Sequence, residues 1–446
     1  MTALAAASIL RRGACPGLSA PMPTGDGLLV RLRPSDSISL AAFRELCAAA
    51  LQHGNGVMEI TARGSIQMRG LSAVSAPRLA RTVASLGIAA EGGIPIISNA
   101  LAGLDPDELI DASDLAVNLR RALARTSLPD RLAPKVSVVI DGGGALGLNS
   151  LSADVRLRAI LINKAVAMRI SVGGDADSAT PLGTVIPSDC TEATLCLLEF
   201  IARRGRDARA RDVVAAGEID SFRESLSSCA DLCQASTSYR REKAKYADGR
   251  DIAERSDAAL RTAMPVHDGN AIGLFSLRDG SYACGIGLTF GHSDAAALEQ
   301  LANAAEAARA VGLRIAPGRA LLAVGLTCDS TAAFTAAAEG LGFTTRAEDR
   351  RRHVIACAGA PICASAHLAA RAMAPHIAEI AAPFDIHISG CAKGCAHPRP
   401  AALTIVGTPA GCALVANGTA RDTPFAMVSP EGLPAAIGRC AEGGHV

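Results

Sequence analysis

The chain has 446 residues, more than one hydrophobic core ordinarily organises, so we expect about two to four domains. Hydrophobic residues make up 49% of it and charged residues 20%, which is typical of a folded globular protein and excludes a disordered or collagen-like chain. The formal net charge of +1 excludes an overall attraction to nucleic acid or to an anionic membrane, so any recognition by charge must be local.

The beginning of the chain does not have the order of a secretory signal. Its apolar residues precede Arg11 and Arg12, whereas a signal peptide places its basic residues before a longer apolar core. No apolar run reaches transmembrane length. The 14 cysteines, in so long a chain, do not have the pattern of a secreted disulfide scaffold. We therefore expect a cytoplasmic protein that binds neither a membrane nor nucleic acid.

The first part of the chain predicts a β-α-β unit. Gly27–Leu32 has the pattern of a strand, Pro34–Asp36 that of a turn, Leu40–Gln52 that of a helix, and Gly56–Thr61 that of a second strand. Ser or Asp in the turn can accept hydrogen bonds from the first free amides of the helix.

The segment after this second strand carries candidate binding residues. If residues 61–70 are extended, an alternation of period two places Arg63, Gln67 and Arg69 on one face and the apolar side chains on the other. Guanidinium groups bind carboxylates through two parallel hydrogen bonds, so a row of them suits a flat ligand with several carboxylates. A solvent-facing polar edge explains the same pattern equally well.

Two further strands are expected at Val136–Ile140 and Val155–Ile162. Between them, Gly142–Gly147 formally matches the glycine pattern of dinucleotide-binding proteins, which must open a helix so that its free amides meet a pyrophosphate. Here another strand follows, so we expect a hairpin turn at Asp141-Gly142 and no nucleotide site. Residues 203–261 then have many charged and few large apolar side chains, which indicates a solvated helical connector.

The β-α-β pattern returns after this connector. Cys284–Phe290 predicts a strand, Gly291–Asp294 a turn with the N-cap, Ala295–Ala310 a helix and Gly312–Ala316 a strand. Both units end on a Gly-Leu pair. We interpret the two units as an internal duplication.

The last part of the chain carries the strongest motif, two pairs of cysteines: Cys357 with Cys363, and Cys391 with Cys395. Four thiolates can hold one compact inorganic centre, and thiolates select zinc, copper(I) or iron–sulfur. The first pair is spaced more widely than zinc ligands usually are, and four cysteines are the standard ligands of a cubane cluster. An iron–sulfur cluster is therefore favoured over a structural zinc site. Two further strands are expected around the second pair, at Asp385–Ser389 and Ala402–Val406.

Together these motifs resemble the nitrite and sulfite reductase family. The shared features are the T-x-R-x-x-x-Q-x-R-G pattern of residues 61–70, the duplication, and the cysteine pairs that end in Cys-Ala-His-Pro. Within the family the chain is most similar to the precorrin-3B synthase subgroup, through residues 12–21, 99–106 and 389–398.

Three residues depart from the anion-reducing members of that family. Ser98 stands where they usually have an arginine, Lys135 lacks a second lysine nearby, and Lys393 stands in place of an asparagine. Each departure weakens the case for the reduction of a small anion.

The resemblance implies an α+β fold of pseudo-twofold design, in which two ferredoxin-like half-domains pair and two α/β lobes of the nitrite/sulfite reductase type flank them. The expected parts are a first half-domain at 12–85, a first lobe at 86–202, a charged helical connector at 203–262, a second half-domain at 263–340, and a second lobe with the cluster at 341–446.

The resemblance to the subgroup also implies an activity. The expected enzyme is a monooxygenase that hydroxylates precorrin-3A at C20 with one oxygen atom of O₂ and closes a γ-lactone, in the aerobic biosynthesis of cobalamin. Arg63, Gln67 and Arg69 would bind the carboxylates of this tetrapyrrole, and Lys135 would be a catalytic residue beside them.

The same resemblance implies the cofactors and the electron source. Cys357, Cys363, Cys391 and Cys395 would hold a 4Fe–4S cluster. No sirohaem is expected, because the tetrapyrrole is the substrate. Because the chain shows no nucleotide motif, electrons from NADH would arrive through a separate ferredoxin or reductase.

The resemblance also implies an additional non-haem iron, whose ligands stay open. His353, His367, His387 and His397 surround the cysteines, but no compact pair of histidines with a nearby acid stands out. A lone histidine is more often a structural residue.

Two other functions remain open. A sirohaem-dependent sulfite or nitrite reductase would show a Soret band. A zinc-stabilised binding protein would contain zinc and no acid-labile sulfide.

Overall fold

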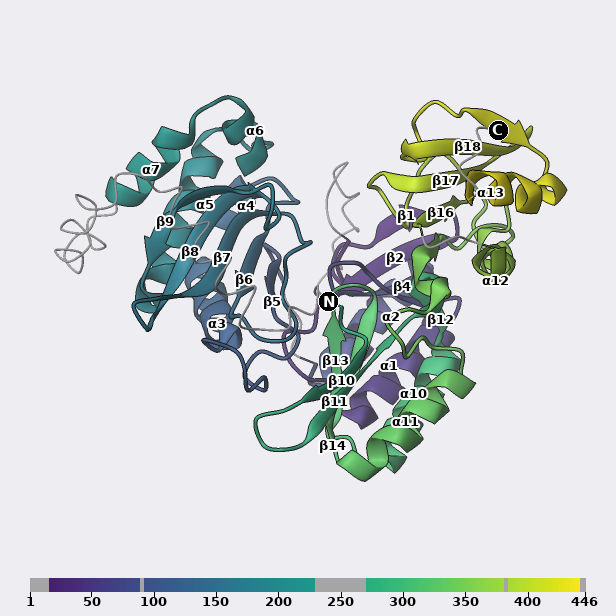
Figure 1. Ribbon diagram of the computed structural model, residues 1–446, viewed down its shortest axis with the longest axis horizontal. Helices are drawn as coiled ribbons and strands as arrows, with labels where there is room; N and C mark the ends of the chain where they lie inside the picture. The colour runs from purple at the N-terminus through teal and green to yellow at the C-terminus, as the bar shows by residue number, and fades with distance from the viewer. Residues whose placement is uncertain (1–15, 89–91, 229–269, 381–383, 442–446) are drawn as a thin grey trace, which may run out of the picture.

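The computed structural model describes residues 16–88, 92–228, 270–380 and 384–441. The described strands form four separate sheets, two in one body and one in each of two lobes, of which the first lies to the left of the body and the second above it in Figure 1. A part of each of the five predicted domains lies outside the described residues: 12–15 of the first half-domain, 89–91 of the first lobe, 229–262 of the connector, 263–269 of the second half-domain, and 381–383 and 442–446 of the second lobe.

The first half-domain is a five-stranded antiparallel sheet with two helices. In spatial order its strands are β1 (Met22–Thr24), β2 (Gly27–Leu32), β4 (Ile66–Leu71), β3 (Val57–Ile60) and β12 (His292–Asp294). The helices are α1 (Leu40–His53) and α2 (Ser75–Ser85). Helix α1 begins where it does because the Ser39 side chain accepts a hydrogen bond from the Ala42 amide, 3.2 Å away.

The second half-domain repeats this arrangement with a four-stranded sheet. In spatial order its strands are β10 (Gly273–Ser276), β11 (Tyr282–Gly287), β14 (Ala320–Leu326) and β13 (Gly312–Ala316), and its helices are α10 (Ala295–Ala307) and α11 (Cys328–Gly340). Strand β11 is shorter than predicted, because Phe290 adopts a left-handed φ of 61° in a short 3-10 turn. Asp294 precedes α10, but its side chain makes no capping hydrogen bond there.

The two half-domains are related by a pseudo-twofold axis, as the duplication predicts. Strand β12 lies beside β3 with Ser293 opposite Met58. At the position related to this one by the axis, Ile38 pairs with Leu313 of β13. Gly70 and Gly325, which close the two units, both have positive φ, 70° and 81°. The same chain path is therefore built twice.

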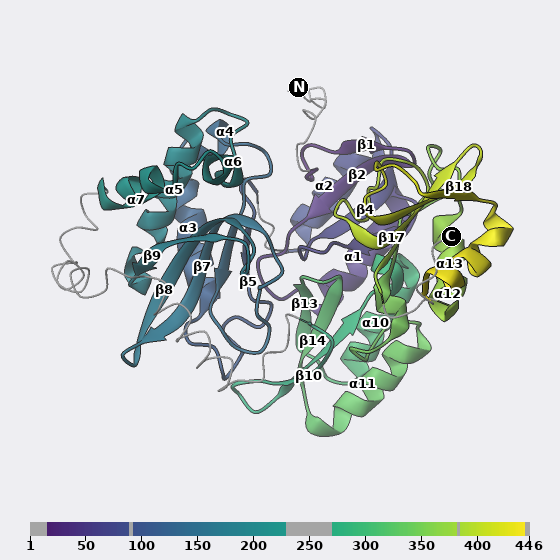
Figure 2. The ribbon, with the colours of Figure 1, turned by 45° about the horizontal axis from the view of Figure 1, so that its top comes forward.

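One hydrophobic core joins the two half-domains. Helices α1 and α10 pack against each other, and buried side chains of both units, such as Phe43, Leu46, Leu301 and Phe334, belong to a single cluster. Figure 2 shows α10 and α11 on the outer side of the sheet that contains β13 and β14. Because each helix layer is covered by the other unit, neither half-domain has a complete core of its own.

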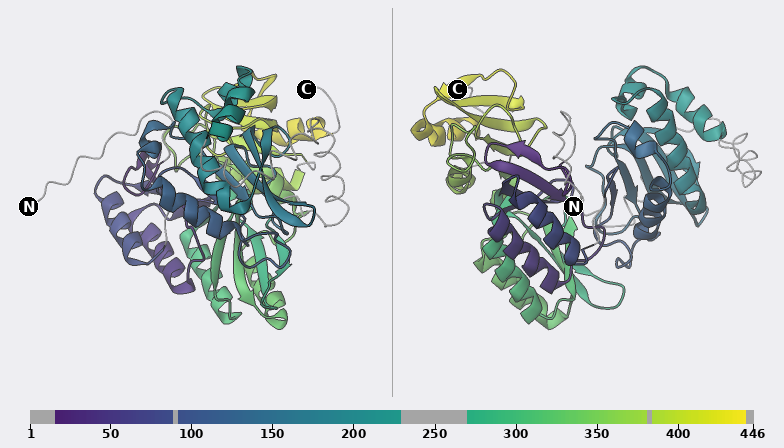
Figure 3. Two further views of the ribbon diagram at one scale, coloured as in Figure 1. Left: turned by 90° about the vertical axis from the view of Figure 1, so that its left-hand side faces the viewer. Right: turned by 180° about the vertical axis from the view of Figure 1, so that it is seen from behind.

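The two lobes share one topology. The first contains β5 (Ile96–Ser98), β6 (Val138–Asp141), β7 (Ala153–Ile162), β8 (Ala165–Gly174) and β9 (Thr180–Val185); the second contains β15 (Val354–Ala356), β16 (Ile386–Ser389), β17 (Ala401–Thr408), β18 (Gly411–Gly418) and β19 (Ala426–Val428). In each lobe the first three strands are parallel and the last two pairings are antiparallel. The right-hand view of Figure 3 shows the second lobe above the central body and the first lobe beside it. The α+β prediction with two half-domains and two lobes is confirmed.

The expected hairpin at Asp141-Gly142 is wrong. Strands β6 and β7 are neighbours but parallel, so residues 142–152 form a long crossover loop and not a tight turn. No helix begins in this loop, which contains Gly142–Gly147. In the second lobe the equivalent loop, residues 390–400, carries Cys391 and Cys395.

Helices cover each lobe sheet. They are α3 (Ala112–Leu123), α4 (Leu128–Arg131), α5 (Cys190–Arg203), α6 (Ala210–Ala215) and α7 (Ile219–Ser228) in the first lobe, and α12 (Ala370–Ile380) and α13 (Leu433–Ala441) in the second. The described part of the predicted connector differs from a solvated segment, because Ala210, Val213 and Phe222 are buried in the core of the first lobe. Of the helices that the structure describes, none has the length and apolarity to cross a bilayer.

Candidate active site

The four cysteines of the motif lie in two loops at one edge of the second lobe. Cys357 directly follows β15, and Cys391 lies two residues beyond the end of β16. These strands are parallel neighbours, so their carboxyl ends meet at the same edge, the usual ligand-binding edge of such sheets. The amide of His367 donates to the Gly390 carbonyl at 2.7 Å, which ties the two loops together.

The thiols are close enough to influence one another. Burial raises the pKa of the Cys357 thiol and negative charge on Cys391 or Cys395 raises it further, whereas the amide of Gly390, 3.1 Å from the sulfur, lowers it. Burial also raises the pKa of Cys395, and the charge of Cys391 adds to the increase. A metal ion binds the thiolate and displaces its proton, so a bound metal would hold these cysteines as thiolates although their pKa is raised in its absence.

The donor set therefore fits a thiolate-bound centre, although its side chains are not closed around one. Among the residues that the structure describes, no three side chains of His, Cys, Asp or Glu are arranged to hold a metal ion. All four thiols are free of disulfide bonds. Backbone packs directly against the loops: the Gly25 position leaves room for Cys363, whose sulfur a side chain there would strike.

The first half-domain faces these thiols with its guanidinium-bearing strand. Arg69 of β4 lies near enough to Cys395 for its charge to lower the pKa of that thiol, against the larger effect of burial. The thiol loops and the edge predicted to bind carboxylates therefore adjoin, although they lie in opposite halves of the chain.

Arg63 does not lie on the extended face that the sequence predicts. Residues 62–64 form the turn between β3 and β4, in which the amide of Gly64 donates to the Thr61 carbonyl at 3.0 Å. From this turn the Arg63 guanidinium reaches the first lobe, where it donates to the Ser152 carbonyl at 2.7 Å and to the Ser137 hydroxyl at 3.0 Å. Only Gln67 and Arg69 occupy β4 itself.

Gln67 and Arg69 belong to a continuous polar network across the sheet. The Gln67 amide oxygen accepts from the Arg31 Nε at 3.2 Å, and its Nε2 donates to Glu59. Arg69 donates to Glu59 at 2.9 Å and, through Nε and Nη2, to both oxygens of Asp26 at 2.9 Å. Burial alone would lower the pKa of Arg69, but these carboxylates hold it above its ordinary value. Arg31, Glu59 and Asp26 were not predicted as site residues.

Lys135 is exposed in the turn that precedes β6. It stands two residues before Ser137, whose hydroxyl accepts from Arg63. Lys135 and Arg63 therefore belong to the same junction between the first half-domain and the first lobe.

A second arginine that the sequence did not reveal holds the other lobe. The β13–β14 turn packs on the β3–β4 turn, with the amide of Gly318 donating to the Ala62 carbonyl at 3.0 Å. From it, Arg319 donates to the Ala396 carbonyl of the cysteine loop at 3.2 Å, and burial lowers the pKa of Arg319 to about 10. The two related turns thus each send one arginine to one lobe. Only the duplication could have pointed to Arg319.

The four candidate histidines have different surroundings. His353 pairs with Asp385 at 3.0 Å, and His367 is exposed. His387 of β16 is fully buried, and neither of its ring nitrogens has a hydrogen-bond partner among the described residues. Its ring centroid lies 5.6 Å from that of His397, and burial lowers the pKa of His387 to about 3.

The first lobe has a polar counterpart of the thiol site. Asn99 directly follows β5, as Cys357 follows β15. The amide of Gly142 donates to the Asn99 side chain at 2.7 Å, just as the amide of Gly390 donates to the Cys357 sulfur. Asn99 in turn donates to the buried Asp141 at 3.0 Å. At equivalent positions, the duplication therefore places a thiol in one lobe and a hydrogen-bonded pair of Asn99 and Asp141 in the other.

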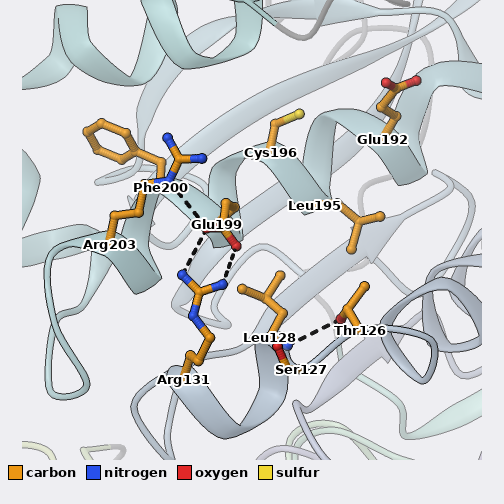
Figure 4. Close-up of a pocket in the computed structure, with 10 residues that line it drawn as sticks. All are labelled: Thr126, Ser127, Leu128, Arg131, Glu192, Leu195, Cys196, Glu199, Phe200 and Arg203. Carbon is orange, nitrogen blue, oxygen red and sulfur yellow. Dashed lines mark hydrogen bonds and ion pairs between the residues drawn. The ribbon is translucent and has the colours of Figure 1, made fainter.

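Two surface pockets have different relations to this site. One, of about 430 Å³, lies beside the cysteine loops and is lined by Cys391, Lys393, His367 and Arg421 among others. The other, of about 480 Å³, lies between α4 and α5, where Glu199 pairs with Arg131 at 2.7 Å and with Arg203 at 3.2 Å (Figure 4). None of the predicted site residues lines this larger pocket.

Comparison with known proteins agrees with the family resemblance that the sequence motifs predict. A family model described as the nitrite/sulfite reductase ferredoxin-like half domain matches residues 20–86. A precorrin-3B synthase of Sinorhizobium sp is 39% identical over 436 residues, which cover 96% of this chain and 88% of the relative. The chain belongs to the precorrin-3B synthase family. The predicted resemblance is confirmed.

A solved structure shows the same fold. The Mycobacterium tuberculosis NirA protein matches with a TM-score of 0.68 and 19% sequence identity, over 93% of this chain and 80% of that one. At this identity the likeness concerns the fold alone.

Proposed function

We propose that this chain is a precorrin-3B synthase. It uses O₂ to hydroxylate precorrin-3A at C20 and closes a γ-lactone from the ring A acetate, within aerobic cobalamin biosynthesis in the cytoplasm. One oxygen atom enters the substrate and the other leaves as water, which requires two electrons and two protons. The observation that carries the proposal is the identity of 39% to a precorrin-3B synthase across nearly the whole chain.

The four cysteines are the proposed ligands of a 4Fe–4S cluster. Bound there, such a cluster supplies electrons one at a time, which triplet O₂ chemistry needs. Support comes from the shared edge of Cys357 and Cys391, the Gly390 amide on the Cys357 sulfur, and the absence of disulfides at these thiols. Amide hydrogen bonds to the sulfurs also tune a cluster's potential.

The chain's own residues then bind and orient the substrate. Arg63, Gln67 and Arg69 are the proposed carboxylate-binding residues, and Lys135 the proposed catalytic residue at the same junction. Three of the five N–H groups of Arg69 already donate to Asp26 and Glu59, so it can offer a substrate carboxylate only the remaining two.

The proposal also includes a source of electrons and the ligands of a second metal. Electrons from NADH are proposed to arrive through a separate donor protein, because the glycine loop at 142–147 opens no helix. Of the four candidate ligands for a non-haem iron, His387 and His397 are favoured. Their rings are adjacent, and neither nitrogen of the buried His387 has a hydrogen-bond partner within the part of the chain that the structure describes.

The test is turnover by anaerobically purified chain. Incubation with precorrin-3A, an NADH-linked donor system and ¹⁸O₂ should give a product that carries one labelled oxygen atom, and the reduced protein should show the paramagnetic signal of a 4Fe–4S cluster. An unlabelled product, or labelled product from NADH and the purified chain alone, contradicts the corresponding part of the proposal. A sirohaem Soret band would establish an anion reductase instead, and zinc without acid-labile sulfide a structural metal site.

A further inference from the structure

The turn between β1 and β2 touches the loop of Cys363. The carbonyl of Gly25 accepts a hydrogen bond from the amide of Ala364 at 2.9 Å. A side chain at Gly25 would collide with the Cys363 sulfur and come within 3.1 Å of the Ser365 amide. The first half-domain therefore forms one wall of the Cys363 loop.

The residue after Gly25 is fixed by a buried ion pair. The Asp26 carboxylate accepts hydrogen bonds from Nε and Nη2 of Arg69, each at 2.9 Å. It also accepts from the Thr24 hydroxyl at 2.7 Å and from the side-chain Nδ2 of Asn55 at 3.1 Å. The Asp26 side chain is 2% exposed and that of Arg69 8%. Burial would raise the pKa of Asp26, but the hydrogen bonds and charge of Arg69 outweigh it and hold the pKa below its ordinary value.

The other end of this ion pair is rigid. Arg69 lies in β4, a strand bonded on both sides, and its remaining nitrogen donates to Glu59 of the neighbouring strand at 2.9 Å. A paired and planar guanidinium with two partners has little freedom to rotate. Because the sheet holds Arg69 in place, the ion pair fixes the position of Asp26, and with it that of the neighbouring Gly25.

We propose that the ion pair between Arg69 and Asp26 is a positioning device that holds residues 24–27 against the Cys363 loop and so sets Cys363 relative to the other three thiols. Asp26 and Gly25 are thus positioning residues for the metal centre, and the carboxylate-binding strand is coupled mechanically to one cluster ligand. This inference rests on the proposed cluster for its consequence, but the packing that it describes exists without one.

The test compares Asp26→Asn with Glu306→Gln in the full-length chain. The control removes an exposed carboxylate that also bonds both terminal nitrogens of an arginine, Arg44, at 2.6 and 3.2 Å. In the metal-free protein, alkylation of each cysteine is followed by mass spectrometry. We expect Cys363 to react roughly tenfold faster in Asp26→Asn than in the control, because the turn that covers it opens more often.

A second measurement and a second variant complete the test. After anaerobic reconstitution, Asp26→Asn should retain less iron and acid-labile sulfide than the control. Gly25→Ala keeps the ion pair but displaces the Cys363 sulfur, so it should show the same two changes. Equal alkylation of Cys363 in Asp26→Asn and in the control overturns the positioning role. Failure of the unmodified chain to bind iron and sulfide overturns the proposed cluster instead, and the alkylation comparison still decides the positioning role.

Discussion

Replacement of Arg69 by methionine tests the energetic role of the buried network. Methionine has a similar apolar stem but no charge, so the variant leaves Asp26 and Glu59, whose side chains are 2% and 14% exposed, without their shared cation. Removal of one partner from a buried ion pair typically costs about 3–5 kcal/mol of unfolding free energy. The matched control is Arg44→Met, whose pair with Glu306 is 26% and 59% exposed and should contribute less than about 1 kcal/mol.

The pH dependence gives the sharper test. In the unmodified protein the pKa of Asp26 lies below its ordinary value of 3.8, so its stabilising effect is present at neutral pH and is lost as the pH falls through the lowered pKa. Without Arg69, burial raises that pKa, and the variant loses stability as the pH rises above the ordinary value. The gap between variant and unmodified protein should therefore narrow on acidification.

Urea unfolding, followed by circular dichroism at about pH 7.5 and about pH 5, measures both effects. We expect a large loss for Arg69→Met at the higher pH, a smaller one at the lower pH, and little change for Arg44→Met at either. A loss that is equal for the two variants, or that does not depend on pH, refutes the network as a source of stability.

Three further predictions concern other parts of the molecule. Gly390→Ala should abolish iron binding, because its Cβ would lie 2.6 Å from the Ala366 Cβ and force the two cysteine loops apart. The control is Gly92→Ala, whose new Cβ has no atom within 4 Å and which should bind iron normally in the same metal analysis. Asn99→Ala should lower the unfolding free energy by about 1–3 kcal/mol, because the Gly142 amide and the buried Asp141 each lose a hydrogen-bond partner. The control is Asn303→Ala at an exposed position, which should change the unfolding free energy little in the same urea titration. Burial lowers the pKa of His292 from 6.5 to about 4, so this side chain takes up its proton more readily in the unfolded state. The protein should therefore lose stability as the pH falls from about 6.5 to about 4, by up to about 1.4 kcal/mol per pH unit from this group. If the unfolding midpoint of His292→Gln depends on pH just as steeply, His292 is not the origin of that dependence.

Features that depend on a few neighbouring residues could be predicted before the fold was known. Strands Gly27–Leu32 and Gly312–Ala316 were predicted with the bounds that the structure has, because short apolar runs flanked by turn residues are a local signal. The duplication was visible for the same reason. The thiol pairs were recognisable because ligand chemistry constrains residue types and spacing over a few positions.

Which charges are available to a ligand, and which chain segments meet, depends on the three-dimensional fold. The same alternation that placed Arg69 beside Arg63 could not reveal that Asp26 and Glu59 neutralise Arg69, or that Arg63 sits in a turn and reaches the first lobe. Whether residues 142–152 turn back or cross over depends on which strands pair, a contact between distant segments. Hydrogen bonds and ion pairs act over a few ångströms in space, and distance along the chain carries no information about them until the fold has brought their partners together.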